Sequence, residues 1–202
     1  GFGGDNSGPT RIPLERELAG ISVRFGRHSA PLFYVGTGQI NAQVPLELAP
    51  GETVPIVVNA RGRLTAPQSY PIAPVQPGIF TAQGRPIVVN ADNRLITPEN
   101  PAFIGETLVI YATGLGLTDP AAATGDALSG PSQVRMPVTV TIGGVPAPVQ
   151  YQGLTPFLVG LHQVNVVVPA GVPPGDAVPL VLRQNGITAN PDQTLTIPVR
   201  AR

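Results

Sequence analysis

Apolar and polar residues alternate along this chain in short runs, and this pattern predicts strands rather than helices. Val138, Val140 and Ile142 would face one side of a strand, and the threonines between them would face the other. Ile21, Val23 and Phe25 repeat the pattern. Clusters of Gly, Pro, Asn and Asp separate such runs at the spacing of a β-sandwich. We therefore expect an all-β fold built of sandwiches.

Residues 20–74 and 137–199 read as two copies of one unit. Gly20-Ile-Ser-Val-Arg-Phe-Gly26 matches Val138-Thr-Val-Thr-Ile-Gly143, and Gln39-Ile-Asn-Ala-Gln-Val-Pro45 matches Gln163-Val-Asn-Val-Val-Val-Pro169. Internal repetition of this kind indicates that one architecture occurs twice.

The two copies differ in front of their first matching block. The second copy is preceded by Gly105-Glu-Thr-Leu-Val-Ile-Tyr-Ala-Thr-Gly114, which predicts a strand. The first copy has only Gly1-Phe-Gly-Gly4, which resembles the turn Gly114-Leu-Gly-Leu117 that follows that strand. We therefore expect the first domain to lack its first strand.

The repeat also predicts the domain boundaries. We expect an incomplete domain 1 at residues 1–74, a packed β connector hairpin at 75–104, and domain 2 at 105–202. Residues 118–136, rich in Ala, Gly, Pro and Ser, predict a long surface loop. Gly143-Gly144 and Asn185-Gly186 are typical of tight hairpin turns, the second one leading to a final strand at 195–199.

Several blocks of the chain, in order, resemble the Solibacter-type C-terminal domain family. The matching blocks are Ala30-Pro-Leu-Phe-Tyr-Val-Gly-Thr-Gly-Gln-Ile-Asn-Ala-Gln-Val-Pro45, Pro77-Gly-Ile-Phe80, residues 108–116, residues 138–148 and residues 160–169. The resemblance covers most of the chain from Leu18 onward. It implies tandem immunoglobulin-like domains of the IPT/TIG type, found at the ends of large secreted or surface proteins, chiefly of acidobacteria. It implies no catalytic residues. Family members usually have a further strand before the first glycine-rich turn, and here only the turn remains.

Composition narrows the classes of function. The 202 residues have zero net charge and only 12% charged residues, which argues against a nucleic-acid partner. The 25 prolines and 24 glycines disfavour long helices. The absence of cysteine excludes disulfides and thiolate chemistry. No apolar run approaches the roughly 18 residues needed to span a bilayer, so we expect no membrane span. With no initiator Met and no signal peptide, we expect a mature fragment or a processed or trimmed product.

Candidate catalytic residues are few. His28 and His162 occupy non-equivalent positions of the repeat, so two solitary histidines are favoured over a shared site. No nucleophile elbow of the Gly-x-Ser-x-Gly type occurs. Glu15 and Glu17 flank Arg16 and are typical of a solvated segment. We therefore predict no enzyme and name no catalytic residue.

Candidate binding residues are equally weak. Asn90, Asp92 and Asn93 could offer oxygens to calcium, but they also form turns and lack EF-hand spacing. The repeated Gln-x-Asn pattern (Gln39, Asn41) favours an amide contact on a sheet over a ligand site. Without Trp, and with Tyr34 and Tyr151 at equivalent positions, an aromatic sugar platform is disfavoured. We predict no cofactor and no metal.

The leading hypothesis is an extracellular structural subunit, located in the secreted fraction or at the cell surface. A sandwich that lacks a strand presents unpaired backbone groups, which a strand from another chain can satisfy. Repeated head to tail, that contact gives a homopolymeric filament by donor-strand complementation of domain 1. The candidate assembly groove is formed by Ile21, Val23 and Phe25, with Ile12, Leu14 and Phe2 beside it.

Three alternatives remain open from the sequence. Ile12, Leu14 and Leu18 could supply a substitute strand within the same chain. The chain could be a non-polymerising spacer or adhesion module of a larger parent secreted protein. It could also be an accessory module that binds a surface polysaccharide.

Overall fold

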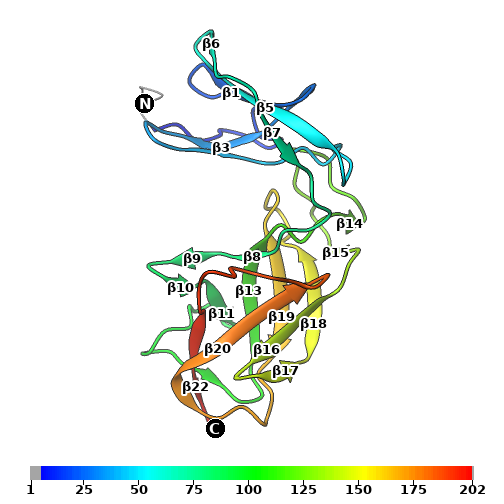
Figure 1. Ribbon diagram of the computed structural model, residues 1–202. Helices are drawn as coiled ribbons and strands as arrows, with labels where there is room; N and C mark the ends of the chain where they lie inside the picture. The colour runs from blue at the N-terminus through cyan, green and yellow to red at the C-terminus, as the bar shows by residue number, and fades with distance from the viewer. Residues whose placement is uncertain (1–5, 202) are drawn as a thin grey trace. The chain divides into compact units, whose positions relative to one another are not determined.

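The computed structural model describes residues 6–201, and this stretch contains strands, turns and no helix (Figure 1). Nearly all strand pairs are antiparallel, with β12–β22 as a parallel exception. The predicted all-β fold is thus confirmed. Residues 6–201 contain no helix, and so no helix that is long and apolar enough to cross a membrane.

Contacts divide the described chain into two compact units. Unit 1 contains residues up to Pro74 together with Ala121–Gly130 and Pro156–Gly160, and unit 2 contains the remainder. Residues 75–104, which we expected as a separate connector, therefore group with unit 2, where Thr81–Ala82 and Arg85–Pro86 form a short hairpin.

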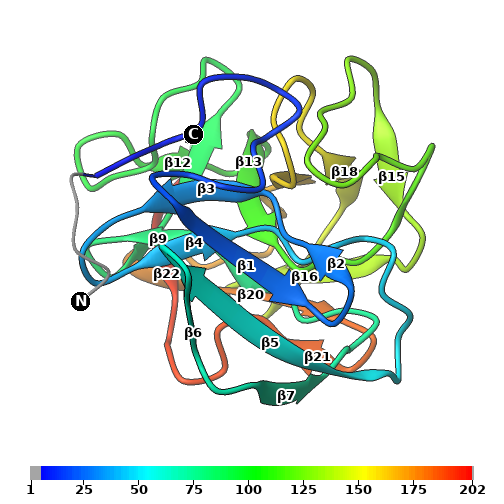
Figure 2. The same cartoon turned by 90° about the horizontal axis from the view of Figure 1, so that it is seen from above.

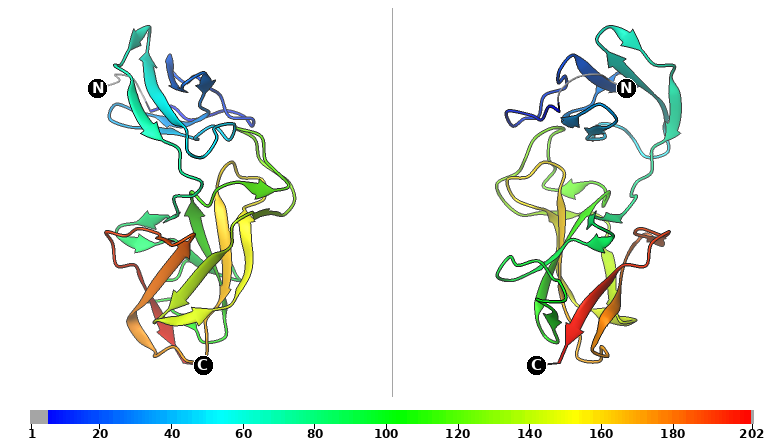
Figure 3. Two further views of the ribbon diagram at one scale, coloured as in Figure 1. Left: turned by 45° about the vertical axis from the view of Figure 1, so that its right-hand side comes forward. Right: turned by 90° about the vertical axis from the view of Figure 1, so that its left-hand side faces the viewer.

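Unit 2 has two main sheets. One has the order β11-β13-β19-β18-β15-β14, with β8 beside β13, and the other has the order β12-β22-β20-β16-β17, with β21 beside β20. In Figure 3 the orange and red strands β20 and β22 lie across from the green and gold strands β13 and β19. The strands of unit 2 are β8 Gly78–Ile79, β9 Thr81–Ala82, β10 Arg85–Pro86, β11 Val88–Asn90, β12 Ala102–Phe103, β13 Thr107–Thr113, β14 Thr118–Asp119, β15 Ser132–Val134, β16 Val138–Ile142, β17 Val145–Ala147, β18 Val149–Leu154, β19 His162–Val167, β20 Gly175–Gln184, β21 Ile187–Thr188 and β22 Thr196–Arg200.

Unit 1 has one sheet of similar design and a second that is much smaller. The larger sheet has the order β2-β1-β5-β6, with β7 also paired to β5, and the smaller consists of β3 and β4 alone (Figure 2). The strands of unit 1 are β1 Ile21–Phe25, β2 His28–Ser29, β3 Leu32–Val35, β4 Ile40–Ala42, β5 Thr53–Ala60, β6 Arg63–Leu64 and β7 Gln68–Pro71.

The larger sheet of unit 1 superimposes in register on the β20 sheet of unit 2. Val23 pairs with Val58 as Val140 pairs with Leu182. The Gly26 amide donates to the carbonyl of Pro55 at 2.8 Å, and the Gly143 amide donates to the carbonyl of Pro179 at 2.8 Å. The internal repeat is therefore a repeat of structure: β1, β5 and β7 correspond to β16, β20 and β22.

The smaller sheet matches as well. β3 and β4 pair with an irregularity between Leu32 and Tyr34, and β18 and β19 pair with the same irregularity between Val149 and Tyr151. Strand β3 therefore corresponds to β18, and β4 to β19.

Two loop predictions need correction. Residues 118–136 are not one loop, because β14 and β15 at its two ends pair with each other. The Asn185-Gly186 turn leads from β20 into β21, and the final strand β22 comes later. The error arose because a two-residue strand leaves no periodicity to read. The Gly143-Gly144 turn is confirmed between β16 and β17, with φ values of 60° and 79° that suit glycine.

The hydrophobic cores differ in size. In the described residues the main buried cluster of unit 2 has 24 members, whereas that of unit 1 has nine. In unit 1, Ile40, Ile56 and Val58 are only partly buried against the cluster. The core of unit 1 is therefore incompletely covered around Ile40, Ile56 and Val58.

Candidate strand-acceptor site in unit 1

Strand β19 of unit 2 is an interior strand. It pairs with β18 on one side and with β13 on the other, where Val166 lies opposite Leu108 and Val164 opposite Ile110 (Figure 1). All four of these side chains are fully buried. Strand β13 therefore pairs with the second edge of β19 and contributes buried side chains to the core.

Strand β4 of unit 1 has only one neighbour. It pairs with β3, and no other strand of residues 6–201 pairs with it. The place that β13 takes beside β19 has no counterpart in the described part of unit 1.

The backbone directions of β4 follow from the hydrogen bonds of β3. Leu32 donates its amide to the carbonyl of Glu15 at 2.8 Å, and Val35 donates to the carbonyl of Ser7 at 2.9 Å. Both amides thus point away from β4, so the pairs Leu32–Ala42 and Val35–Ile40 are non-hydrogen-bonded pairs of an antiparallel ladder. The backbone N–H and C=O groups of Ile40 and Ala42 must then face the side without a neighbour.

Val44 continues this row of backbone groups. Its counterpart Val168 donates to the carbonyl of Glu106 and accepts from the amide of Gly105, both at 2.9 Å. The Val44 amide has no hydrogen-bond partner within residues 6–201. We call the outward backbone groups of Ile40, Ala42 and Val44 the open edge.

An apolar surface lies beside the open edge. Val44 is 48% exposed, whereas its counterpart Val168 is 1% exposed. Tyr70 on β7, paired with Val54, is 52% exposed, whereas Ile197, paired with Val178, is 2% exposed. On β5, Ile56 and Val58 are partly exposed, where the corresponding leucines of β20 are buried. We call Ile40, Val44, Ile56, Val58 and Tyr70 the open face.

The predicted groove residues do not form this open face. Ile21, Val23 and Phe25 lie together on β1, as their alternation predicts, but all three are buried in the core of unit 1. Their side chains are covered by the chain itself, because β3 and Leu48 close over β1 in the same cluster. They contribute the floor of the site and present no free surface.

The remaining predicted groove residues separate. Leu14 is buried, and Ile12 is 50% exposed. Phe2 lies outside the described residues. The structure thus does not bring Ile12 and Leu14 into one surface.

Residues 6–20 do not replace the strand missing beside β4. Ser7 and Glu15 bond to β3, on the side opposite β4. Leu14 donates its amide to the carbonyl of Gly125, and Leu18 pairs with Ile21. The predicted alternative, a substitute strand from Ile12, Leu14 and Leu18, is therefore not formed along the open edge.

A contact that the sequence did not predict fixes the segment that follows β4. The Thr124 hydroxyl donates to the Glu47 carboxylate at 2.7 Å and accepts from the Leu46 amide at 2.9 Å. The Gly125 amide donates to the side-chain oxygen of Gln43 at 2.7 Å. The hydrogen bond from Thr124 lowers the pKa of Glu47. This segment of unit 1 is fixed by side chains and leaves the open edge uncovered.

The two histidines lie in different units. His162 is buried on β19, opposite Ala112, and neither ring nitrogen has a hydrogen-bond partner within the described residues. Burial lowers its pKa to about 4, so this imidazole is neutral at pH 7. His162 is a core residue of unit 2.

The other polar candidates have structural partners. The Asn90 side-chain oxygen accepts from the amides of Asp92 and Arg94, as in a turn. The Thr10 hydroxyl donates to Glu15 at 2.7 Å and lowers the pKa of that carboxyl. The Gln39 side-chain amide donates to the side-chain oxygen of Asn41. Within residues 6–201 no cluster of three or more His, Cys, Asp or Glu residues could hold a metal ion.

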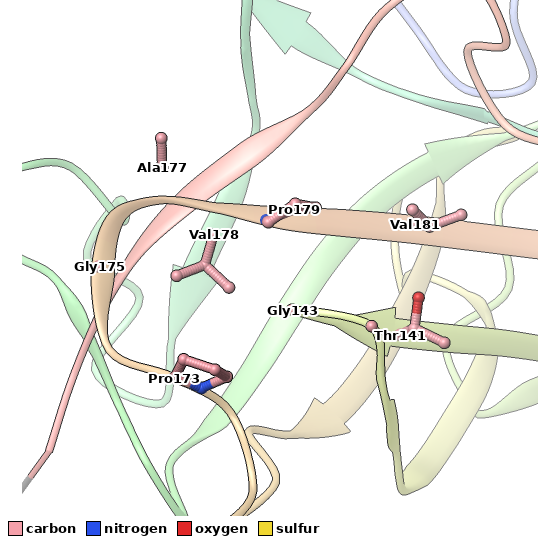
Figure 4. A pocket seen from close by; sticks show the side chains of 9 residues that line it. Thr141, Gly143, Pro173, Gly175, Ala177, Val178, Pro179 and Val181 are labelled. Carbon is pink, nitrogen blue, oxygen red and sulfur yellow. The ribbon is translucent and has the colours of Figure 1, made fainter.

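One hollow lies on unit 2, where β16 turns beside β20. It measures about 480 Å³ and is lined by Thr141, Pro173, Val178 and Val181 among others (Figure 4). No charged side chain lines it, and it offers no chemistry beyond apolar contact.

No protein-family model matches the chain, and no curated protein matches it. The resemblance to the Solibacter-type C-terminal domain family therefore rests on the motif blocks alone.

The sequence analysis placed the groove on Ile21, Val23 and Phe25 because they form the clearest alternating strand of the first copy, and it therefore missed the open-edge residues. The repeat itself held the signal. Ile40 aligns with Val164, which lies opposite Ile110 of β13, and Ile56 aligns with Leu180, which is buried in the same core cluster as Ile110.

Proposed function

We propose that this protein is an extracellular structural subunit of the secreted fraction or cell surface, built from two tandem immunoglobulin-like sandwiches. It assembles head to tail into a filament, and a strand from another copy completes unit 1. It has no enzymatic activity. The observation that carries the proposal is the open edge of β4 beside a partly exposed apolar face.

The open edge supports this function because one added strand would remove two unfavourable features of unit 1. Unpaired backbone groups and exposed apolar side chains are both unfavourable, and an added strand satisfies the first while covering the second. Natural edge strands are usually protected by charges or bulges, but residues 38–44 carry no charge. The sequence of β4 thus suits an interior strand.

Assembly through this contact would not close on itself. The acceptor is on unit 1, and the donor comes from a different part of the next copy, so the interface is heterologous. A heterologous contact that does not return to its starting point after a few copies gives an open filament. The motif blocks that resemble surface proteins are consistent with such a product.

The decisive experiment is negative-stain electron microscopy and size-exclusion chromatography of three proteins. The wild-type chain is expected to form filaments. Ala42→Pro removes an amide of the open edge that no group in the described part of unit 1 uses, so it should abolish filaments while the monomer stays folded.

Ala42→Ser is the matched control, because it changes the side chain and keeps the amide. It is expected to weaken assembly far less than Ala42→Pro does. Dispersed wild-type particles with a single cooperative melt would refute assembly and favour the non-polymerising spacer module.

A further inference from the structure

The chain contains a template for the strand that would complete unit 1. β13 occupies the corresponding place in unit 2, antiparallel to β19. Because β4 pairs with β3 in the same register and with the same bulge as β19 pairs with β18, the two acceptor strands require the same kind of neighbour. We propose that the open edge binds an antiparallel strand with the side-chain pattern of β13. This inference rests on the proposed function and specifies the donor that assembly uses.

The register of the donor follows from the repeat. In unit 2 the fully buried Leu108 and Ile110 face the core opposite Val166 and Val164. The corresponding acceptor residues are Ala42 and Ile40. The donor therefore carries large aliphatic residues opposite Ala42 and Ile40, two positions apart. A slip of one residue would turn both to solvent, so the open face selects this register.

The direction of the donor follows from Val44. In unit 2 the residues that bond to Val168 are Gly105 and Glu106, at the start of the strand segment. The donor therefore begins beside Val44 and runs toward Gly38. Its first residues satisfy the Val44 backbone, and its later residues cover Ile56 and Val58.

The acceptor position with the largest change in side-chain size, Gly38 in place of His162, sets a preference. Ala112 lies opposite His162, whose imidazole is buried. The corresponding acceptor residue of unit 1 is Gly38, and a Cβ added there meets nothing within 4 Å. The donor can thus carry a residue larger than alanine opposite Gly38.

The test uses a fluorescein-labelled peptide with the sequence of residues 105–115, titrated with the full chain kept dispersed at low concentration. The peptide is expected to bind the wild type, and to bind Ala42→Pro at least tenfold more weakly than it binds Ala42→Ser. A peptide with Leu108→Asp and Ile110→Asp is expected to lose binding by at least tenfold. A peptide with Ala112→Leu is expected to bind at least as tightly as the parent.

Hydrogen exchange locates the bound peptide. Protection is expected to appear at the amides of Ile40, Ala42 and Val44. Absence of binding, binding that Ala42→Pro or the aspartate substitutions leave unchanged, weaker binding of the Ala112→Leu peptide, or protection elsewhere would overturn the inference.

The outcomes separate this inference from the proposed function. If the peptide binds at the open edge but the wild-type chain forms no filaments, the donor pattern stands and head-to-tail assembly fails. If filaments form and Ala42→Pro abolishes them, while the peptide neither binds nor blocks them, assembly stands and the β13-like donor is wrong.

Discussion

Strands β4 and β19 are the same strand in two copies of one unit, yet β19 lies inside its sheet and β4 lies at an edge. Both alternate apolar and amide residues, and neither has a charge between its Gln-x-Asn motif and its proline. The difference between them therefore arises from the neighbour and not from the strand. An interior-type sequence at an edge position is what an acceptor for a further strand requires.

Amide hydrogen exchange on dispersed protein should show the largest difference between β4 and β19. Val164, Val166 and Val168 should exchange only when unit 2 opens, whereas the amides of Ile40, Ala42 and Val44 have no bonded partner among residues 6–201. We expect the second set to exchange at least about a thousand times faster than the first. Asn41 and Gln43 face β3 and serve as the internal control, since they should be protected. Equal protection at Ala42 and Val166 would mean that unit 1 is already complete.

Proline substitutions should separate the two strands almost as strongly. Val166→Pro removes a donor from an interior strand and leaves a carbonyl of β13 unpaired, which should destabilise unit 2 by at least about 3 kcal/mol. Ala42→Pro should change the stability of monomeric unit 1 by less than about 1 kcal/mol, because its amide is unused. Urea denaturation, read by hydrogen exchange in each unit, measures both. A large loss with Ala42→Pro would contradict the assigned direction of the β4 backbone.

Truncation of matched core residues tests the open face. Leu180→Ala should destabilise unit 2 by about 3 kcal/mol, because the side chain is fully enclosed. Ile56→Ala should cost about 1 kcal/mol in the monomer, since its side chain is only partly buried. The cost of Ile56→Ala should rise once a donor strand covers β5. The same urea series with and without the peptide of residues 105–115 provides the check.

A separate prediction concerns pH and a position at which the two copies differ, since His162 corresponds to Gly38. The pKa of His162 is lowered from 6.5 to about 4, so below pH 6.5 the unfolded chain takes up a proton that folded unit 2 does not. Stability from this group is complete above pH 6.5 and decreases toward pH 4. The loss should reach about 2 kcal/mol at pH 5 relative to pH 7.5.

His162→Val removes this titration and should flatten the pH dependence of unit 2 over the same range. The readout is the urea midpoint of wild type and variant at each pH. A wild-type curve parallel to that of the variant would show that another group is responsible for the pH dependence.

Much of the fold could be predicted from the sequence because apolar alternation and the internal repeat indicate the same strands. The alternation of Val138, Val140 and Ile142 predicts a buried and an exposed side for β16, and the structure has both. From the strand at residues 105–114, the sequence predicted that domain 1 lacks its first strand, but it placed the resulting groove at Ile21, Val23 and Phe25 and not along β4.

The rest depended on contacts between residues far apart in the sequence. Nothing in the local pattern of Thr124 or Gly125 indicates Glu47 and Gln43 as partners, some 80 positions away. The location of the open face was also beyond a local reading. Tyr70 has the pattern of a polar segment, and only its pairing with Val54 places it on the inner side of the sheet.

The contacts of Thr124 and Gly125 have a consequence for folding during synthesis. Unit 1 comes first in the sequence, yet Leu14, Gln43 and Glu47 find their partners only in residues 121–130. Residues 121–130 must therefore leave the ribosome before unit 1 can acquire these bonds. Unit 1 therefore completes its hydrogen bonds only after part of unit 2 has been synthesised.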